Sequence, residues 1–320
     1  MNPRFDVTIA GELNLDLILY GLPPELSPER ELLADSMVLT LGSSSAIVAH
    51  NLASLGTKVG FQSLIGEDPL GRIALERLAL SGVETSRVRA VKSLGTGLSV
   101  ILQRDGWRNI LTYPGAISRL SCGDLDLDYL SDARHFHLSS YYLQSDLRPN
   151  VPELFRRLKA AGLTISLDTN DDPENRFGDD LYKVLELVDI FLPNQREACR
   201  IAGTDNLEAA TKKLSGIVPL LVVKVGAQGA IAVRNNERTD SAAVKVETVD
   251  PVGAGDSFDA GFLHAYLKGQ SLSDCMTAGN AAGALCTTRA GGTEAFLDRQ
   301  HRERFLRQHA PLCNLRSVKV

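Results

Sequence analysis

A glycine-rich segment around residue 253 carries the residue types that phosphoryl transfer requires. It reads Asp250-Pro251-Val252-Gly253-Ala254-Gly255-Asp256-Ser257-Phe258, after a strand pattern at Val244–Val249 and before a helical pattern at Ser257–Leu267. Two glycines at such a turn let the backbone approach a ligand closely, and the free amides of a helix N-terminus favour an anion. An aspartate there can accept a proton from a hydroxyl. The segment therefore offers a cradle for developing negative charge, in Gly253, Ala254 and Gly255, and a base in Asp256.

Two other interpretations of this segment are a plain tight turn, with Asp256 capping the helix, and a dinucleotide-binding loop. The dinucleotide pattern fails because Phe258 stands where its third glycine belongs, and because the segment lies late in the chain instead of opening a βαβαβ unit. No G-x-x-x-x-G-K-[ST] sequence occurs, and the H-R-D and D-F-G sequences of protein kinases are also missing. A tight turn and a phosphoryl-transfer turn remain open from this segment alone.

A second pair of polar residues near the N-terminus could recognise hydroxyl groups. Asn14 and Asp16 alternate along a strand pattern, so their side chains project from one face. An amide beside a carboxylate suits the recognition of two adjacent hydroxyls. The alternative is the solvent-exposed polar face of an ordinary strand.

The elements that would position these residues alternate between short apolar strands and longer helices. Strand patterns lie at residues 5–10, 59–65, 135–139, 164–167, 190–192 and 220–225, and helical patterns at 46–55, 70–81, 151–161 and 206–214. This alternation predicts an α/β fold with a doubly wound, mostly parallel sheet and helices on both of its faces.

Two regions interrupt the alternation with strand patterns that have no long helix between them. Their strand patterns lie at residues 14–20, 33–41, 97–104 and 108–113. The last two flank Asp105-Gly106, a strong hairpin-turn signal. We expect a small antiparallel β lid from about residues 13–41 and 96–114, inserted in a single domain that spans residues 1–320.

Five segments, in order along the chain, resemble those of the ribokinase-like (PfkB) carbohydrate kinase family. Asp250–Asp256 looks like the family's D-[TP]-x-G-A-G-D signature. Gly11–Asp16 is similar to the family's sugar-binding segment, and Gly42–Gly56 to its glycine-rich substrate turn with the following helix. Asn194–Glu197 is similar to its N-x-x-E motif, and Lys224–Gly229 to its nucleotide-side strand and turn. Any one match is weak, but five in register across nearly the whole chain are specific.

The resemblance implies the ribokinase-like fold and transfer of the ATP γ-phosphate to a primary hydroxyl of a sugar or sugar-like molecule. A nucleoside kinase of the same fold and a catalytically silent nucleotide- or sugar-binding regulator are the alternatives. The intact turn from Gly253 to Asp256 argues against the silent regulator, which would not need the base.

The resemblance also implies a role for each matched position. Asp256 would deprotonate the attacking hydroxyl, and Gly253, Ala254 and Gly255 would bind the phosphoryl group. Substrate binding would fall to Asn14, Asp16, Gly42, Ser43, Ser44 and Ile47, and nucleotide binding to Asn194, Lys224, Gly226, Gly229 and Asn280. Glu197 would order the hydration shell of Mg²⁺, and a monovalent cation such as K⁺ would be held by Asp250, Val252, Arg289 and Gly291.

Purely structural roles stay open for several of these positions. Asn194 and Glu197 are also spaced as the cap of an ordinary helix. Lys224 could be a surface lysine, and the loop Arg289–Thr293 a plain glycine-rich turn.

Three positions depart from the family pattern. Pro251 stands where threonine is commonest, Ser43 replaces a glycine, and Ile47 replaces an asparagine that touches substrate hydroxyls. A site that loses a hydrogen-bonding partner discriminates against the matching hydroxyl. The isoleucine therefore favours a sugar that lacks one hydroxyl. Arg104 and Arg108 flank the hairpin turn, and if either reaches the site it favours a sugar with an acid group. The alternative for both arginines is a solvated hairpin tip.

Composition limits the partners. The chain of 320 residues is 44% hydrophobic and 23% charged, with a formal net charge of -5, which excludes a disordered or fibrous protein. It has no basic run, so we expect no nucleic acid and no membrane as partner. Its five cysteines match no zinc spacing, and no signal peptide or membrane-length apolar run is seen, so we expect a cytoplasmic protein.

In the strand pattern after Asn14, Leu15, Leu17 and Leu19 lie on the side opposite Asp16, Ile18 and Tyr20. This pattern predicts an apolar outer face of the lid. We expect a homodimer formed through that face.

Overall fold

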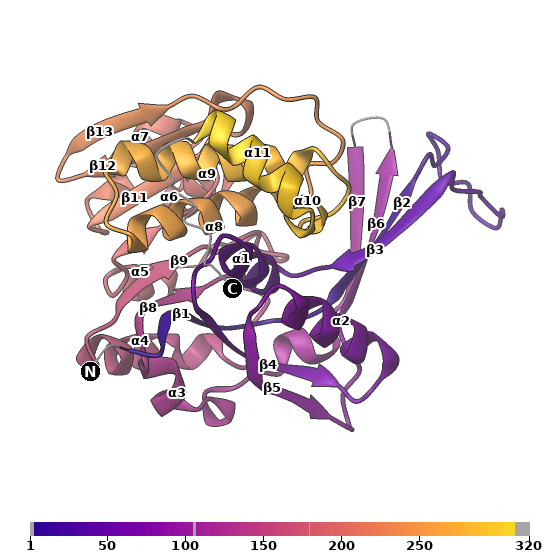
Figure 1. Ribbon diagram of the computed structural model, residues 1–320, viewed down its shortest axis with the longest axis horizontal. Helices are drawn as coiled ribbons and strands as arrows, with labels where there is room; N and C mark the ends of the chain where they lie inside the picture. The colour runs from indigo at the N-terminus through magenta and orange to yellow at the C-terminus, as the bar shows by residue number, and fades with distance from the viewer. Residues whose placement is uncertain (1–2, 105–106, 179, 311–320) are drawn as a thin grey trace.

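The computed structural model describes residues 3–104, 107–178 and 180–310. The described residues form a nine-stranded sheet in the order β13-β12-β11-β10-β9-β8-β1-β4-β5 (Figure 1). Its strands are β1 (Phe5–Ala10), β4 (Val59–Gly66), β5 (Glu84–Val91), β8 (Ala133–Leu138), β9 (Thr164–Leu167), β10 (Ile190–Phe191), β11 (Leu220–Lys224), β12 (Ala230–Arg234) and β13 (Glu237–Ser241). Every pairing from β5 to β11 is parallel, and β12 and β13 pair antiparallel at the edge.

The central strands are apolar because both of their faces are covered by helices. One face packs on α1 (Ser44–Ser54), α2 (Pro69–Leu80), α8 (Ala254–Leu267) and α9 (Leu272–Thr287). The other packs on α3 (Leu127–Ser131), α4 (Val151–Ala160), α5 (Asp180–Leu185), α6 (Gln195–Ala202) and α7 (Leu207–Ser215). The short α10 (Glu294–Leu297) and α11 (Arg299–His309) pack against α9. The doubly wound sheet expected from the sequence is confirmed.

A second sheet of the order β3-β2-β6-β7 projects from this body (Figure 1). Its strands are β2 (Leu15–Tyr20), β3 (Ser36–Leu41), β6 (Leu98–Arg104) and β7 (Trp107–Tyr113). Its two outer pairings, β2–β3 and β6–β7, are antiparallel, and β2 and β6 pair in parallel at the centre. The small sheet is where the sequence predicts it, and the Asp105-Gly106 turn lies outside the described residues.

The two faces of the small sheet differ in character because cross-strand neighbours share a face. The polar row nearest the body is Thr40–Asp16–Ser99–Thr112, and it faces the catalytic turn. The opposite face is made of apolar rows such as Leu39–Leu17–Val100–Leu111.

A buried chain of hydrogen bonds crosses β8 and β9 on the face toward α8. It runs from Thr164 through His135, Ser166 and His137 to Ser139, each step 2.7 Å long. Burial lowers the pKa of His135 to about 3 and that of His137 to about 4, so both rings are neutral near pH 7. The chain ends beside the carboxyl edge of the sheet, where polar side chains gather.

One expected strand is wrong. Val244–Val249 forms no strand; this segment leaves the edge strand β13 and crosses α9, and the N–H groups of Val249 and Asp250 both donate to the carbonyl of Thr287. Residues 244–247 alternate valine with a charged residue as in a half-buried strand, but among the described residues the sheet has no strand beyond β13. Within the described ranges, every helix is too short or too polar to span a bilayer.

Candidate active site

Asp256 lies in the first turn of α8, directly after the turn at residues 253–255. Gly253 has a left-handed backbone with φ 73°. A Cβ atom at Gly253 would lie 2.5 Å from the Cα of Gly292, so only glycine lets these two loops touch. The first amides of a helix have no intrahelical partner, which suits this turn to an anion.

The carboxyl group of Asp256 is buried, with 8% exposure. Burial raises its pKa above the ordinary value, the charge of Asp168 adds to the rise, and hydrogen bonds from Ser44 and Asn170 oppose it. A carboxylate held this way is more basic than one in water, which is the property a general base needs.

Asn14 and Asp16 lie side by side at the start of β2, as expected. The amide of Asn14 donates to Asp16 at 3.5 Å. Burial raises the pKa of Asp16 to about 7, and the nearby charge of Asp256 contributes next. A Cβ atom on Gly42 would lie 2.3 Å from Asp16 Oδ1, so the glycine makes room for this pair.

Ser43 occupies the N-cap of α1. Its backbone has φ 64°, and its hydroxyl donates to the carbonyl of Glu12 at 2.8 Å. The Glu12 carboxyl is buried and accepts from the hydroxyl of Ser45 at 2.7 Å.

Ile47 is buried against the catalytic turn. Its Cδ1 lies 2.6 Å from the place a Cβ on Gly292 would take, and 3.4 Å from the one on Gly253. Its side chain therefore supports the backbone that should hold the phosphoryl group.

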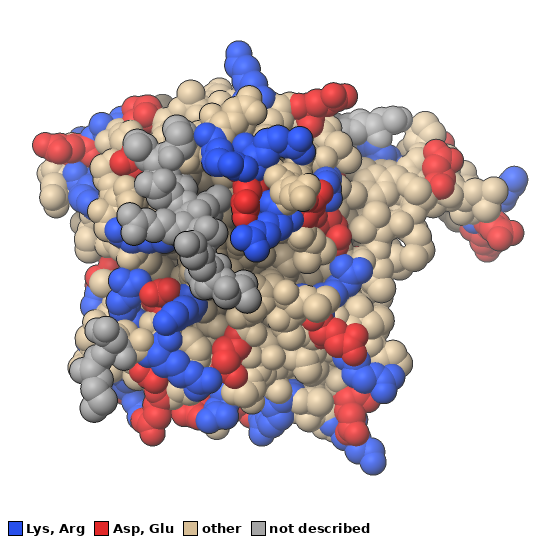
Figure 2. Space-filling model, viewed as in Figure 1, with Lys and Arg blue, Asp and Glu red and all other residues tan. Residues whose placement is uncertain are grey.

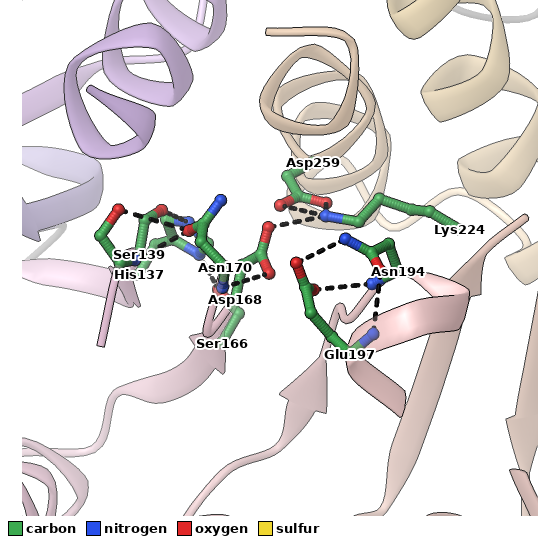
Figure 3. Close-up of polar contacts among 10 residues, drawn as sticks. His137, Ser139, Ser166, Asp168, Asn170, Asn194, Glu197, Lys224 and Asp259 are labelled. Carbon is green, nitrogen blue, oxygen red and sulfur yellow. Dashed lines mark hydrogen bonds and ion pairs between the residues drawn. The ribbon is translucent and has the colours of Figure 1, made fainter. Parts of the chain in front are cut away.

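Asn194 and Glu197 form a complete capping box at the start of α6. The Glu197 amide donates to Asn194 Oδ1 at 3.0 Å, the Asn194 amide donates to Glu197 Oε2 at 2.9 Å, and the Asn194 side chain also donates to Glu197 (Figure 3). Burial raises the pKa of Glu197 to about 8, with Asp168 as the next cause. The helix cap that the spacing also suggested is present. It holds the carboxyl group of Glu197 in the site.

Lys224, at the end of β11, is a buried lysine and not a surface one. Its Nζ donates to Asp168 at 2.6 Å and to both oxygens of Asp259 at 3.1 Å (Figure 3). Burial works against the ammonium, but the carboxylates of Asp168 and Asp259 raise the pKa of Lys224, so it stays charged.

The remaining nucleotide-side residues shape the loop that follows β11. Gly229 has φ 105°, and a Cβ there would lie 2.0 Å from the carbonyl oxygen of Ser241. Gly226 also has positive φ, 58°, at the start of the short turn that links β11 to β12. Asn280 on α9 donates to the carbonyls of Ser241 and Ala242, each at 3.1 Å. These contacts hold the chain after β13 against α9.

Asp250 is fully buried and accepts three hydrogen bonds. The amides of Val252 and Gly291 donate to it at 3.0 Å each, and the Tyr20 hydroxyl donates at 2.8 Å. Arg289 instead pairs at 2.7 Å with Asp298, at the surface.

Main-chain carbonyls converge around the buried thiol of Cys286. Those of Val252, Gly291 and Gly292 lie 3.3, 3.9 and 3.5 Å from the thiol sulfur of Cys286. Converging carbonyl oxygens are ligands that hard cations prefer. The described His, Cys, Asp and Glu side chains form no group of three that could hold a metal by themselves.

Several site residues were missed by the sequence reasoning. Asp168 and Asn170 follow β9, and Asn170 has a left-handed backbone with φ 52° and accepts from the Ser140 amide at 2.9 Å. Asn51 on α1 donates to Ser257 at 2.9 Å and to the Gly292 carbonyl at 3.1 Å. An available signal was the Asp-Thr-Asn run directly after a buried strand, at the edge where α/β proteins place their sites.

A separate cavity of about 530 Å³ lies at the opposite edge of the large sheet. Thr164, Asp189, Leu220, Arg234 and Tyr266 are among its lining residues. They sit at the amino ends of the parallel strands and at the far end of α8 from Asp256. The convergent carboxylates and the glycine turn, and not this cavity, mark the candidate active site.

Comparison with known proteins agrees with this arrangement. Residues 4–299 match the pfkB family carbohydrate kinase model. An uncharacterized sugar kinase of Archaeoglobus fulgidus is 30% identical over 77% of this chain and 97% of its own. A ribokinase of Haemophilus influenzae is 27% identical over 96% of this chain and all of its own, 100%. The crystal structure of an E. coli protein assigned as ribokinase II, in complex with ATP and Mg²⁺, superposes with a TM-score of 0.83 at 27% identity, covering 95% of this chain and 100% of that one.

Proposed function

Because this chain belongs to the pfkB family of carbohydrate kinases, we propose that it transfers the γ-phosphate of ATP to a primary hydroxyl of a sugar or sugar-like molecule, with Asp256 as the base. The observation that carries the proposal is the position of Asp256: a buried carboxylate of raised pKa, directly behind the glycine turn at the start of α8. A charge-cradling turn and a base within one helical turn are the parts that phosphoryl transfer needs.

The chain's own residues fit this nucleotide and its metal. Bound ATP and Mg²⁺ supply the phosphoryl group and spread its negative charge. The turn at residues 253–255 binds the transferring group through its amides. It packs closely on Gly292, and a side chain at Gly253 would block that contact. Glu197 and Asn194 would orient waters around the metal, since Mg²⁺ keeps several of its waters in protein sites.

Asp256 then accepts the proton of the substrate hydroxyl on a carboxylate oxygen. Ser44 and Asn170 orient that carboxylate through the hydrogen bonds that lower its pKa. Asn14 and Asp16 hold neighbouring hydroxyls, and the polar row of the lid closes over the substrate and excludes water.

A neutral polyhydroxylated acceptor fits the charges around the site. Asp16 and Asp256 are acidic, and their mutual repulsion already contributes to the raised pKa of Asp16. Of the two hairpin arginines, Arg104 lies on the outer face and donates to the Pro24 carbonyl at 3.0 Å. Arg108 lies on the inner face, lowers the pKa of Asp16 and forms no ion pair with a described residue. Of the two hairpin arginines, Arg108 is therefore the one placed to pair with an acidic sugar.

A panel assay for ADP release tests the proposal. Neutral pentoses and hexoses, nucleosides and a keto-deoxy sugar acid are each offered with ATP and Mg²⁺. We expect turnover with at least one neutral sugar. Turnover confined to nucleosides would identify a nucleoside kinase, and saturable binding without ADP release for any compound would indicate a silent regulator. Preference for the sugar acid that is lost in Arg108→Gln would replace the neutral-sugar assignment.

We also propose a K⁺ site at the Asp250 loop. The carbonyls of Val252, Gly291 and Gly292 converge around the Cys286 thiol, in the two loops whose amides donate to the Asp250 carboxylate. A bound cation there would stiffen the turn that holds the phosphoryl group.

A further inference from the structure

One buried lysine serves four buried carboxyl groups in this site. Lys224 is 9% exposed, and Asp168, Asp256, Asp259 and Glu197 are 2%, 8%, 0% and 5% exposed. Buried charges of one sign are costly unless an opposite charge is placed among them. The cation that acts on all four carboxyl groups is Lys224.

The position of Lys224 is set from both halves of the site. Its backbone amide donates to the Pro193 carbonyl at 3.0 Å, which joins the end of β11 to the residue before Asn194. Its Nζ lies 3.6 Å from where a Cβ on Gly255 would stand. The ammonium therefore sits against the catalytic turn on one side and beside the Asn194–Glu197 cap on the other (Figure 3).

All donor capacity of this ammonium is directed at carboxylates. Nζ donates to one oxygen of Asp168 and two oxygens of Asp259, and an ammonium has three N–H groups. A direct contact from Lys224 to the nucleotide, as the sequence suggested, would have to break one of these bonds.

The charge of Lys224 acts on the base and on the cap. Burial and the Asp168 charge raise the pKa of Asp256 and of Glu197, and the Lys224 charge opposes both rises. Removing the lysine would therefore raise the pKa of Asp256 further.

We propose that Lys224 is a positioning residue for the catalytic base: its ammonium, clamped between Asp168 and Asp259, supports the turn at Gly255 and favours the ionised form of Asp256. This inference rests on the proposed function for the role of Asp256. The ion triad itself rests on geometry alone.

The pH dependence of kcat/KM tests the electrostatic part. In Lys224→Met the acid limb should move to higher pH, because losing a nearby positive charge raises the pKa of a carboxyl group. In Asp168→Asn it should move to lower pH, because that variant removes the negative charge that opposes Asp256. The double variant should return the limb toward its wild-type position. A loss of pure packing would lower the rate at every pH and could not produce opposite shifts.

Thermal unfolding without ATP and Mg²⁺ tests the triad independently of turnover. In the wild type the Lys224 charge holds the pKa of Asp168 below its ordinary value, so this pair stabilises the fold above the unfolded pKa of aspartate and is lost as pH falls. In Lys224→Met, Asp168 and Asp259 are buried without a cation, and their folded pKa values rise. The stability deficit of the variant should therefore grow as pH rises from roughly 4 to 8.

Lys159→Met is the matched control, since Lys159 pairs with Asp189 at 2.7 Å at the surface. It should leave the acid limb in place. If Lys224→Met does not fold, the pH dependence of kcat/KM in Asp168→Asn still tests the proposal. An acid limb that stays in place or moves to higher pH in Asp168→Asn contradicts it. A pH-independent stability deficit and an unmoved acid limb in Lys224→Met would overturn it. If instead Asp256→Asn keeps full turnover, the base assignment fails while the stability result still judges the triad.

Discussion

The Tyr20 hydroxyl donates a 2.8 Å hydrogen bond to the Asp250 carboxylate, although 230 residues separate them. Tyr20 ends β2, the strand that begins with Leu15 and Asp16. The same Asp250 accepts from the amides of Val252 and Gly291, which belong to the two loops that meet at Gly253 and Gly292. The substrate strand and the phosphoryl turn are therefore joined by one side-chain contact.

We expect Tyr20→Phe to weaken substrate capture more than nucleotide binding. The variant keeps the ring that packs beside Ile18 and Val252 and loses one hydrogen bond to a charged group, worth roughly 1.5–3 kcal/mol. A looser β2 should raise the KM for the acceptor several-fold and leave the KM for ATP nearly unchanged. Tyr113→Phe, at an exposed tyrosine of the same sheet, is the control. Equal rises in both KM values would contradict this coupling.

Asp16→Asn should stabilise the protein, increasingly so as pH rises. The folded pKa of Asp16 is about 7 against an ordinary 3.8, so the folded state binds the proton more tightly than the unfolded state does. Stability then falls as pH rises from 3.8 to 7, and above 7 the ionised carboxylate costs on the order of 4 kcal/mol. Asn mimics the neutral form without that cost.

The measurement is the thermal midpoint of wild type and Asp16→Asn at pH 4 and pH 8. The gain should be small at pH 4 and clear at pH 8. Asp205→Asn, at an exposed site, controls for the loss of one negative charge. An equal gain in thermal midpoint at both pH values would show that burial does not raise the pKa of Asp16.

The parts of this site that could be predicted are those carried by local spacing. The turn at residues 253–256, the Asn14–Asp16 pair and the Asn194–Glu197 cap each follow from residues within a few positions of one another. The central strands of the large sheet followed from the alternation of strand and helix patterns, and β9 lies where it was predicted. Three outer strands, β5, β12 and β13, were not predicted.

The missed parts depend on contacts between distant segments. Lys224 meets Asp168 across 56 residues and Asp259 across 35, so no local pattern marks this triad as buried. Ile47 packs against Gly292, which follows it by more than two hundred residues, so its support of the catalytic turn could not be seen in the local sequence. Val244–Val249 begins with the alternation of a strand, yet among the described residues it has no partner strand at the edge of the sheet.

Potassium should activate the enzyme. The rate with K⁺ should exceed that with tetramethylammonium at equal ionic strength, because the converging carbonyls of Val252, Gly291 and Gly292 suit a small hard cation and not a bulky organic one. Asp250→Asn should reduce the difference. Identical rates in the two salts would remove the cation site.

The chain should form a homodimer through the outer face of the small sheet. That face carries half-buried Leu17, Leu39 and Val100 and exposed Leu111, and the part of the sheet visible in Figure 2 is largely uncharged up to its tip. Exposed apolar areas of this kind are commonly buried in interfaces.

Light scattering at micromolar concentration checks the dimer. Leu111→Glu should give monomers, and Leu80→Glu, at an 80% exposed leucine on α2, should leave the dimer intact. A monomeric wild type would contradict the interface.

The most direct test of the account is the turnover of Asp256→Asn with the best acceptor from the panel, measured alongside ATP binding by calorimetry. Asn keeps the size and the helix-capping ability of Asp256 but cannot take the proton. We predict that kcat falls by roughly two to four orders of magnitude while the Kd for ATP changes little. A kcat near that of the wild type would contradict the assignment of Asp256 as the base.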